Sequence, residues 1–133
     1  MASPLFRKID CIMLKADDLD AATRFYCGLG HAVIWKTEEA VAFHLPETDT
    51  EFVVHKRIGP ETDLLVEDAD VAHQILVKAG ARSVMAPFDI PIGRCAVVED
   101  PFGNRLVVLD QSNGEFVTDE HRNVVGVAPK AHP

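Results

Sequence analysis

The stretch that decides the fold is residues 100–110, which read DPFGNRLVVLD. Pro101 fixes its own φ, and Gly103 and Asn104 tolerate the left-handed conformations that tight turns need. The apolar run 106–109 has the length and composition of a mostly buried strand. The stretch therefore predicts a turn that leads directly into a strand of the core.

Working outward, two helix-like segments repeat each other. Residues 17–30 (DDLDAATRFYCGLG) align without a gap with residues 67–80 (EDADVAHQILVKAG), at an offset of 50 residues. Both begin with aspartates that can cap a helix, carry apolar residues at three- and four-residue spacing, and end on a glycine. Asp100-Pro101 likewise corresponds to Leu45-Pro46, at an offset of 55 residues. Such internal similarity predicts a duplicated structural unit.

Short β-prone segments separated by turn residues surround both helices. In the first half they are residues 8–16, 31–36, 40–45 and 51–56, and in the second half 63–67, 82–85, 94–99 and 105–110. Beyond Gln111, residues 114–127 predict a hairpin around a polar turn at 119–123. The order indicates two βαβββ units, about 7–57 and about 61–111, within a single domain of residues 1–133, with a hairpin tail at 112–133.

Composition narrows the class of protein. The chain has 133 residues, of which 47% are hydrophobic and 26% charged, as in ordinary globular domains. The net charge of −8 argues against nucleic acid or an anionic membrane as partner. No signal peptide or membrane span is apparent, and the three cysteines lack a disulfide spacing. We therefore expect a cytoplasmic protein with reduced thiols.

The repeated helix and the DPFGN turn together resemble the vicinal oxygen chelate superfamily, which includes glyoxalase I, extradiol dioxygenases, fosfomycin-resistance transferases and bleomycin-binding proteins. The resemblance covers roughly residues 7–111. It implies an α+β fold in which two βαβββ units form a curved mixed β-sheet around a cavity, with the helices on the outside. It also implies a homodimer, with units swapped or placed edge to edge.

In metal-dependent members of that superfamily, the ligands come from the first and last strands of each unit. Carried over residue by residue, those positions hold Cys11 and about Val53 in the first unit, and Glu61 and Val107 in the second. Valine has no lone pair, and a divalent metal needs about three protein ligands. The resemblance therefore implies the fold without the usual metal site, and we expect no cofactor.

Two alternatives place chemistry on the same strands. Cys11, His55 and Glu61 could form a rearranged site for zinc, nickel, iron or manganese, which would favour a metal-dependent lyase or dioxygenase of the glyoxalase type. Cys11 could instead act as a nucleophile, activated by His55 or Lys15. A buried Cys11 that only fills space is the simpler interpretation.

The favoured hypothesis is a protein that binds a small organic molecule in the sheet cavity, with or without catalysis. The expected pocket combines apolar residues with a few polar ones, as ligand sites usually do. Trp35, Phe43 and Phe88 are possible aromatic walls. A structural or partner-binding domain with a filled cavity is the third alternative. The expected pocket residues are Cys11, Met13, Val53, His55, Glu61, Arg94 and Val107.

Overall fold

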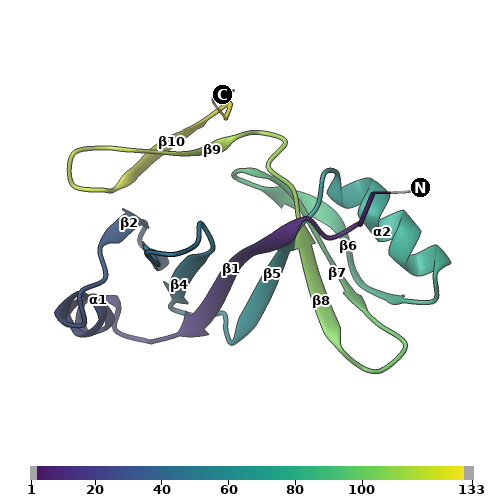
Figure 1. Cartoon of the computed structure of the whole chain (residues 1–133), viewed down its shortest axis with the longest axis horizontal. Helices are drawn as coiled ribbons and strands as arrows, with labels where there is room; N and C mark the ends of the chain where they lie inside the picture. The colour runs from purple at the N-terminus through teal and green to yellow at the C-terminus, as the bar shows by residue number, and fades with distance from the viewer. Residues whose placement is uncertain (1–2, 131–133) are drawn as a thin grey trace. The chain divides into compact units, whose positions relative to one another are not determined.

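The computed structural model describes residues 3–130. In this part of the chain, ten strands and two helices follow the order β1-α1-β2-β3-β4-β5-α2-β6-β7-β8-β9-β10 (Figure 1). The predicted α+β class with two βαβββ units and a C-terminal hairpin is confirmed. Contacts divide the chain into a first unit, residues 10–62 with 116–126, and a second unit, residues 3–9, 63–115 and 127–130.

The first unit carries four strands in the order β2-β3-β4-β1. Their bounds, with that of the helix, are β1 Lys8–Lys15, α1 Leu19–Gly28, β2 Val33–Lys36, β3 Ala40–Phe43 and β4 Glu51–His55. β1 and β4 are parallel, whereas β3 is antiparallel to both of its neighbours. Helix α1 packs on one face of these strands, against Val41, Phe43 and Val54.

The second unit repeats this arrangement, with the order β5-β8-β7-β6. Its bounds are β5 Glu61–Leu65, α2 Ala69–Lys78, β6 Arg82–Ile90, β7 Gly93–Glu99 and β8 Arg105–Leu109. Helix α2 lies across β6 and β7 (Figure 1) and covers a cluster that includes Ala96 and Val108. Neither helix in the described residues is long and apolar enough to cross a membrane.

The repeated aspartates cap both helices as predicted. The side chains of Asp18 and Asp68 accept hydrogen bonds from the backbone N–H groups of Ala21 and Val71, each at 3.0 Å. Each of these bonds satisfies an N–H that the first helical turn leaves without a partner. The two repeated segments therefore begin their helices with the same aspartate cap.

Strand β6 is longer than the sequence predicted. It continues to Ile90, although residues 86–90 include a proline and an aspartate, which strands usually avoid. Two register shifts against β7, between Ser83 and Met85 and between Met85 and Phe88, accommodate this part of the strand. Such irregularities, like prolines, are typical of edge strands, where one side of the backbone forms no ladder.

The C-terminal tail forms the predicted hairpin from β9 (Glu115–Thr118) and β10 (Val124–Ala128). Asp119 closes its turn by accepting hydrogen bonds from the backbone N–H groups of His121 and Asn123, at 2.8 and 2.9 Å. Asp100 and Asn104 close the DPFGN turn in the same way, with N–H to carboxylate distances of 2.9 and 2.8 Å. The same Asp-x-x-x-Asn spacing therefore stabilises both turns.

Candidate functional site

The face of the first unit that points away from α1 carries three of the seven predicted pocket residues. Met13 pairs directly with Val53 across the parallel β1–β4 ladder, so their side chains share this face. Cys11 and Val53 are 5% and 2% exposed and pack with Ala40 and Ala42. Met13, Ile34 and Trp35 border this cluster. We call these seven residues the first-unit face, and its surface is apolar.

The indole N–H of Trp35 is a polar group at the border of the first-unit face. Its indole N–H donates a hydrogen bond of 3.0 Å to Glu51, and its ring lies 4.8 Å from that of Phe116 on β9. Glu51 is also the direct cross-strand partner of Cys11. Sequence reasoning missed the roles of Glu51 and Phe116, because only the register and the hairpin reveal them.

The corresponding face of the second unit carries Val107. Its cluster consists of Cys95, Val97, Val107 and Leu109, with Phe88 packed against it. Asp63, which is 5% exposed, pairs with Val107 across the parallel β5–β8 ladder and shares its face. The sequence held a signal for Asp63, since the 50-residue offset leads from Met13 to this position. This second-unit face combines an apolar surface with one buried carboxylate.

One predicted pocket residue, Arg94, and one possible aromatic wall, Phe43, lie elsewhere. Arg94 alternates with Cys95 along β7 and therefore points to the α2 side. Its guanidinium donates hydrogen bonds to Asp70 at 3.0 and 3.2 Å and to Asp89 at 3.0 Å, and these bonds raise the pKa of Arg94. The interpretation of Arg94 as a ligand for an anion is therefore not supported. Phe43 likewise packs against Tyr26, with ring centroids 5.4 Å apart, on the α1 side.

His55 does not act as the rearranged site requires. Its Nδ1 accepts hydrogen bonds from the backbone N–H groups of Arg57 and Ile58, at 2.9 and 3.1 Å. An Nδ1 that accepts leaves the proton of the neutral ring on Nε2, where it blocks a metal. His55 also lies four residues along β4 from Glu51, the partner of Cys11, which corresponds to ~13 Å of strand. His55 is therefore a turn-capping residue.

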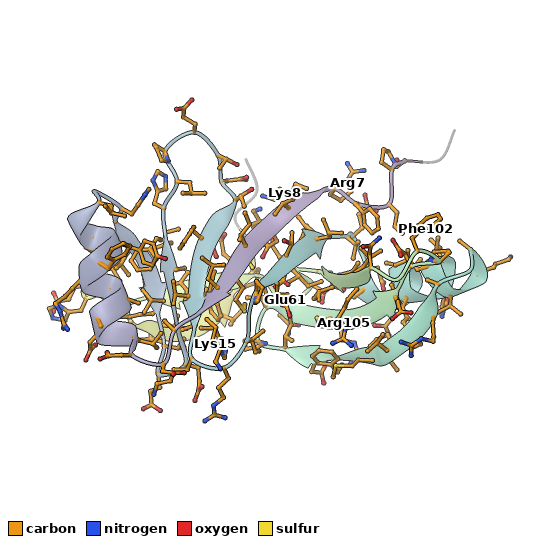
Figure 2. All side chains as sticks on the ribbon, turned by 90° about the horizontal axis from the view of Figure 1, so that it is seen from below. Arg7, Lys8, Lys15, Glu61, Phe102 and Arg105 are labelled. Carbon is orange, nitrogen blue, oxygen red and sulfur yellow. The ribbon has the colours of Figure 1, made fainter. Side chains whose placement is uncertain are left out.

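The same register bears on the reactivity of Cys11. Lys15, at the end of β1 (Figure 2), pairs with His55 four positions along the ladder from the Cys11–Glu51 pair, so neither lies beside the thiol. The residue opposite Cys11 is Glu51, which is acidic, whereas reactive cysteines need an electropositive neighbour or a base. No disulfide involves Cys11, Cys27 or Cys95. Cys11 is best described as a small buried side chain of the first-unit face.

The described residues do not fit a bound divalent metal. The side chains of Val53 and Val107 have no atom that can bind a metal. The Nδ1 atom of His55 accepts hydrogen bonds from the backbone, and Glu61 lies at the start of β5 (Figure 2). Among residues 3–130, no three His, Cys, Asp or Glu side chains gather in a group that could hold a metal ion. Cys11, His55 and Glu61 therefore do not form the rearranged site.

A separate groove of about 470 Å³ lies at the start of α1 in the first unit. Acidic residues, including Asp17, Asp18 and Asp20, line it together with Lys36 and Lys56. Asp18 is the helix cap, and Asp20 lies in the first turn, where a negative charge favours the helix dipole. These charges are explained by the start of the helix, and the groove is not assigned a ligand.

Comparison with known proteins identifies the family. The profile of the Glyoxalase/Bleomycin resistance protein/Dioxygenase superfamily matches residues 8–108. The chain belongs to this superfamily. Members of the superfamily share the paired-unit fold, so the match accounts for both βαβββ units and leaves the hairpin outside it. No curated protein sequence matches the chain.

Two structures illustrate the shared fold. Methylmalonyl-CoA epimerase from Mycobacterium tuberculosis is 17% identical, with a TM-score of 0.69 over 84% of this chain and 93% of that protein. Homoprotocatechuate 2,3-dioxygenase from Brevibacterium fuscum, in complex with 3,4-dihydroxyphenylacetate, is 22% identical, with a TM-score of 0.60 over 81% of this chain and 37% of that one. At these identities the similarity concerns the fold, and the reaction must be argued from the residues.

Proposed function

We propose that this superfamily member binds a small organic molecule on its sheet faces without a metal ion. The observation that supports this most directly is the chemistry at the family's ligand positions. Val53 and Val107 occupy two of them, are 2% and 6% exposed, and pack within apolar clusters. A surface of this kind, with single polar contacts at Trp35 and Asp63, resembles a small-molecule site more than a metal centre.

The proposal covers binding both with and without a reaction of the bound molecule. Polarisation of a substrate oxygen by a metal would need ligands that the chain does not present at Val53 or Val107. Burial of both faces also favours a second candidate, a structural or partner-binding domain whose faces are filled by side chains. A cytoplasmic homodimer without nucleic-acid or membrane partners remains part of the proposal.

Trp35 provides a direct test, because it is the chain's single tryptophan and borders the first-unit face. We expect a member of a panel of small aromatic and anionic molecules, including 3,4-dihydroxyphenylacetate and methylmalonyl-CoA, to change Trp35 fluorescence and raise the melting temperature in the presence of EDTA. Met13→Lys, which places a charge on this face, is expected to weaken that binding at least tenfold.

Ile12→Lys is the matched control, since Ile12 is the next residue of β1, points to the opposite side and is 38% exposed. We expect it to bind as the unchanged protein does. Binding that appears only after a divalent metal is added, and disappears with EDTA, would contradict the proposal. A panel without any binder would favour the filled structural domain.

A further inference from the structure

The C-terminal hairpin lies outside residues 8–108, the part shared with the superfamily, so its function must be read from its own residues. It is held in place within the first unit. The Phe116 ring contacts Trp35, and the carbonyl of Arg122 accepts a 2.9 Å hydrogen bond from the backbone N–H of Lys36. A single bridge between Lys36 and Asn123 accompanies it. The hairpin is thus anchored at its turn and at β9.

Beyond that bridge, β10 presents an open edge. In the described residues, β10 belongs to a two-stranded sheet with β9 only, so one row of its backbone N–H and C=O groups meets no strand of this chain. Its sequence, VVGVA, has neither a charge nor a proline. Val125 and Val127 are 65% and 36% exposed, and Val117 on β9 is 40% exposed. An exposed, uncharged, β-branched edge readily pairs with another strand.

The edge strand β6 differs from β10 in each of these respects. β6 ends the row β5-β8-β7-β6, and it has two register shifts, a proline at position 87 and charged residues at both ends. Arg82 pairs with Glu99 at 3.1 Å, and Asp89 pairs with Arg94 at 3.0 Å. These are the usual means by which proteins prevent pairing at an edge. Their absence from β10 indicates that its edge has a partner.

We propose that the homodimer, which is part of the proposed function, forms by antiparallel pairing of β10 with β10 of a second copy of the chain. An antiparallel pair of identical strands is related by a two-fold axis. The same uncharged edge of each copy therefore supplies hydrogen-bond partners for the backbone of the other. It joins two hairpins, each of which would be marginal as a two-stranded sheet, into four strands. The antiparallel direction also brings Lys130, which follows β10, toward the turn of the other copy, where Asp119 and Glu120 lie beside Arg122.

The test is the mass of the untagged full-length chain in solution, measured by light scattering and sedimentation over a range of concentrations. We expect a dimer that dissociates on dilution. Val125→Lys, which places one positive charge from each copy at the shared edge, is expected to weaken the dimer at least tenfold. Val125 is mostly exposed, so circular dichroism should show an unchanged fold.

Two control variants distinguish this contact from nonspecific hydrophobic association. Val125→Thr keeps a β-branched, uncharged side chain and should keep the dimer. Phe102→Lys removes the 85% exposed side chain of the DPFGN turn (Figure 2) and should also keep it. A chain that is monomeric at every concentration, or a dimer that Val125→Lys leaves unchanged, would overturn the proposal.

A cross-linking variant gives a second readout if the lysine disturbs the hairpin. Val125→Cys is made together with Cys27→Ser, because Cys27 is an exposed thiol. Added oxidised glutathione is expected to join two copies through position 125, as seen by a doubled mass that dithiothreitol reverses. Failure of Val125→Cys to cross-link while the protein remains dimeric would place the interface elsewhere.

Discussion

Replacing Asp110 with alanine is expected to lower the free energy of unfolding by roughly 3–5 kcal/mol. The Asp110 side chain is buried, with 2% of the residue exposed, and accepts backbone N–H bonds from Ala69, Arg94 and Ser112 at 2.8, 2.9 and 3.1 Å. It also accepts the Ser112 hydroxyl at 2.7 Å. One carboxylate thereby joins the start of α2, the start of β7 and the chain after β8. Urea unfolding measures the loss.

Asp89→Ala is the matched control for this prediction. The side chain of Asp89 is 89% exposed and makes one 3.0 Å contact with Arg94, so its loss should cost less than about 1 kcal/mol. Equal losses for the two aspartates would contradict the role assigned to Asp110.

The pH dependence of stability is a second test of the role of the Asp110 carboxylate. Burial alone would raise the pKa of Asp110, but the hydrogen bonds from Ala69, Ser112 and Arg94 outweigh it and lower the pKa below 3.8. The stabilisation is therefore complete above the unfolded pKa and is lost as the pH falls through the folded one. Asp110→Asn should flatten the fall in stability below about pH 4. An unchanged acid profile would count against the assignment.

Gly93→Ala is expected to destabilise the protein by about 2–4 kcal/mol, because a Cβ at this position has no room. It would meet the carboxylate and the carbonyl oxygen of Asp110 and the backbone nitrogen of Ser112. Two of these three contacts are with backbone, which cannot rotate away. The hydrogen bonds of Asp110 would have to lengthen to admit the methyl group.

Gly28→Ala is the appropriate comparison, since a Cβ at Gly28 meets nothing within 4 Å and the residue lies in the last turn of α1. Alanine there should stabilise the protein by up to about 1 kcal/mol. Thermal and urea unfolding of both variants test the pair. A Gly93→Ala protein as stable as Gly28→Ala would show that the packing around Asp110 is looser than described.

Most helices, strands and turns could be predicted from the sequence, because each of them depends on a local sequence pattern. The caps at Asp18 and Asp68 and the Asp-x-x-x-Asn turns act within five residues of chain, so a single sequence reveals them. The end of β6 was missed because a bulged edge strand tolerates a proline that a central strand would not.

The candidate site was predictable only in part, because it depends on which face each side chain occupies. Met13 and Val53 could be placed by period-two alternation along their strands. The ion pair of Arg94 was not predicted, because the sequence does not reveal Asp70 on α2 as its partner. The hydrogen bonds that His55 accepts from Arg57 and Ile58 were not predicted, because they form only after the chain turns beyond β4.

The measurement that tests the central claim most directly is the metal content of the untagged protein, determined by elemental analysis. It is made after purification and again after dialysis against zinc or nickel followed by removal of the free metal. With valine at positions 53 and 107 and His55 bound to the backbone, we predict far less than one metal ion per chain in both samples. Near-stoichiometric metal that is lost in Cys11→Ala or Glu61→Ala would contradict the account.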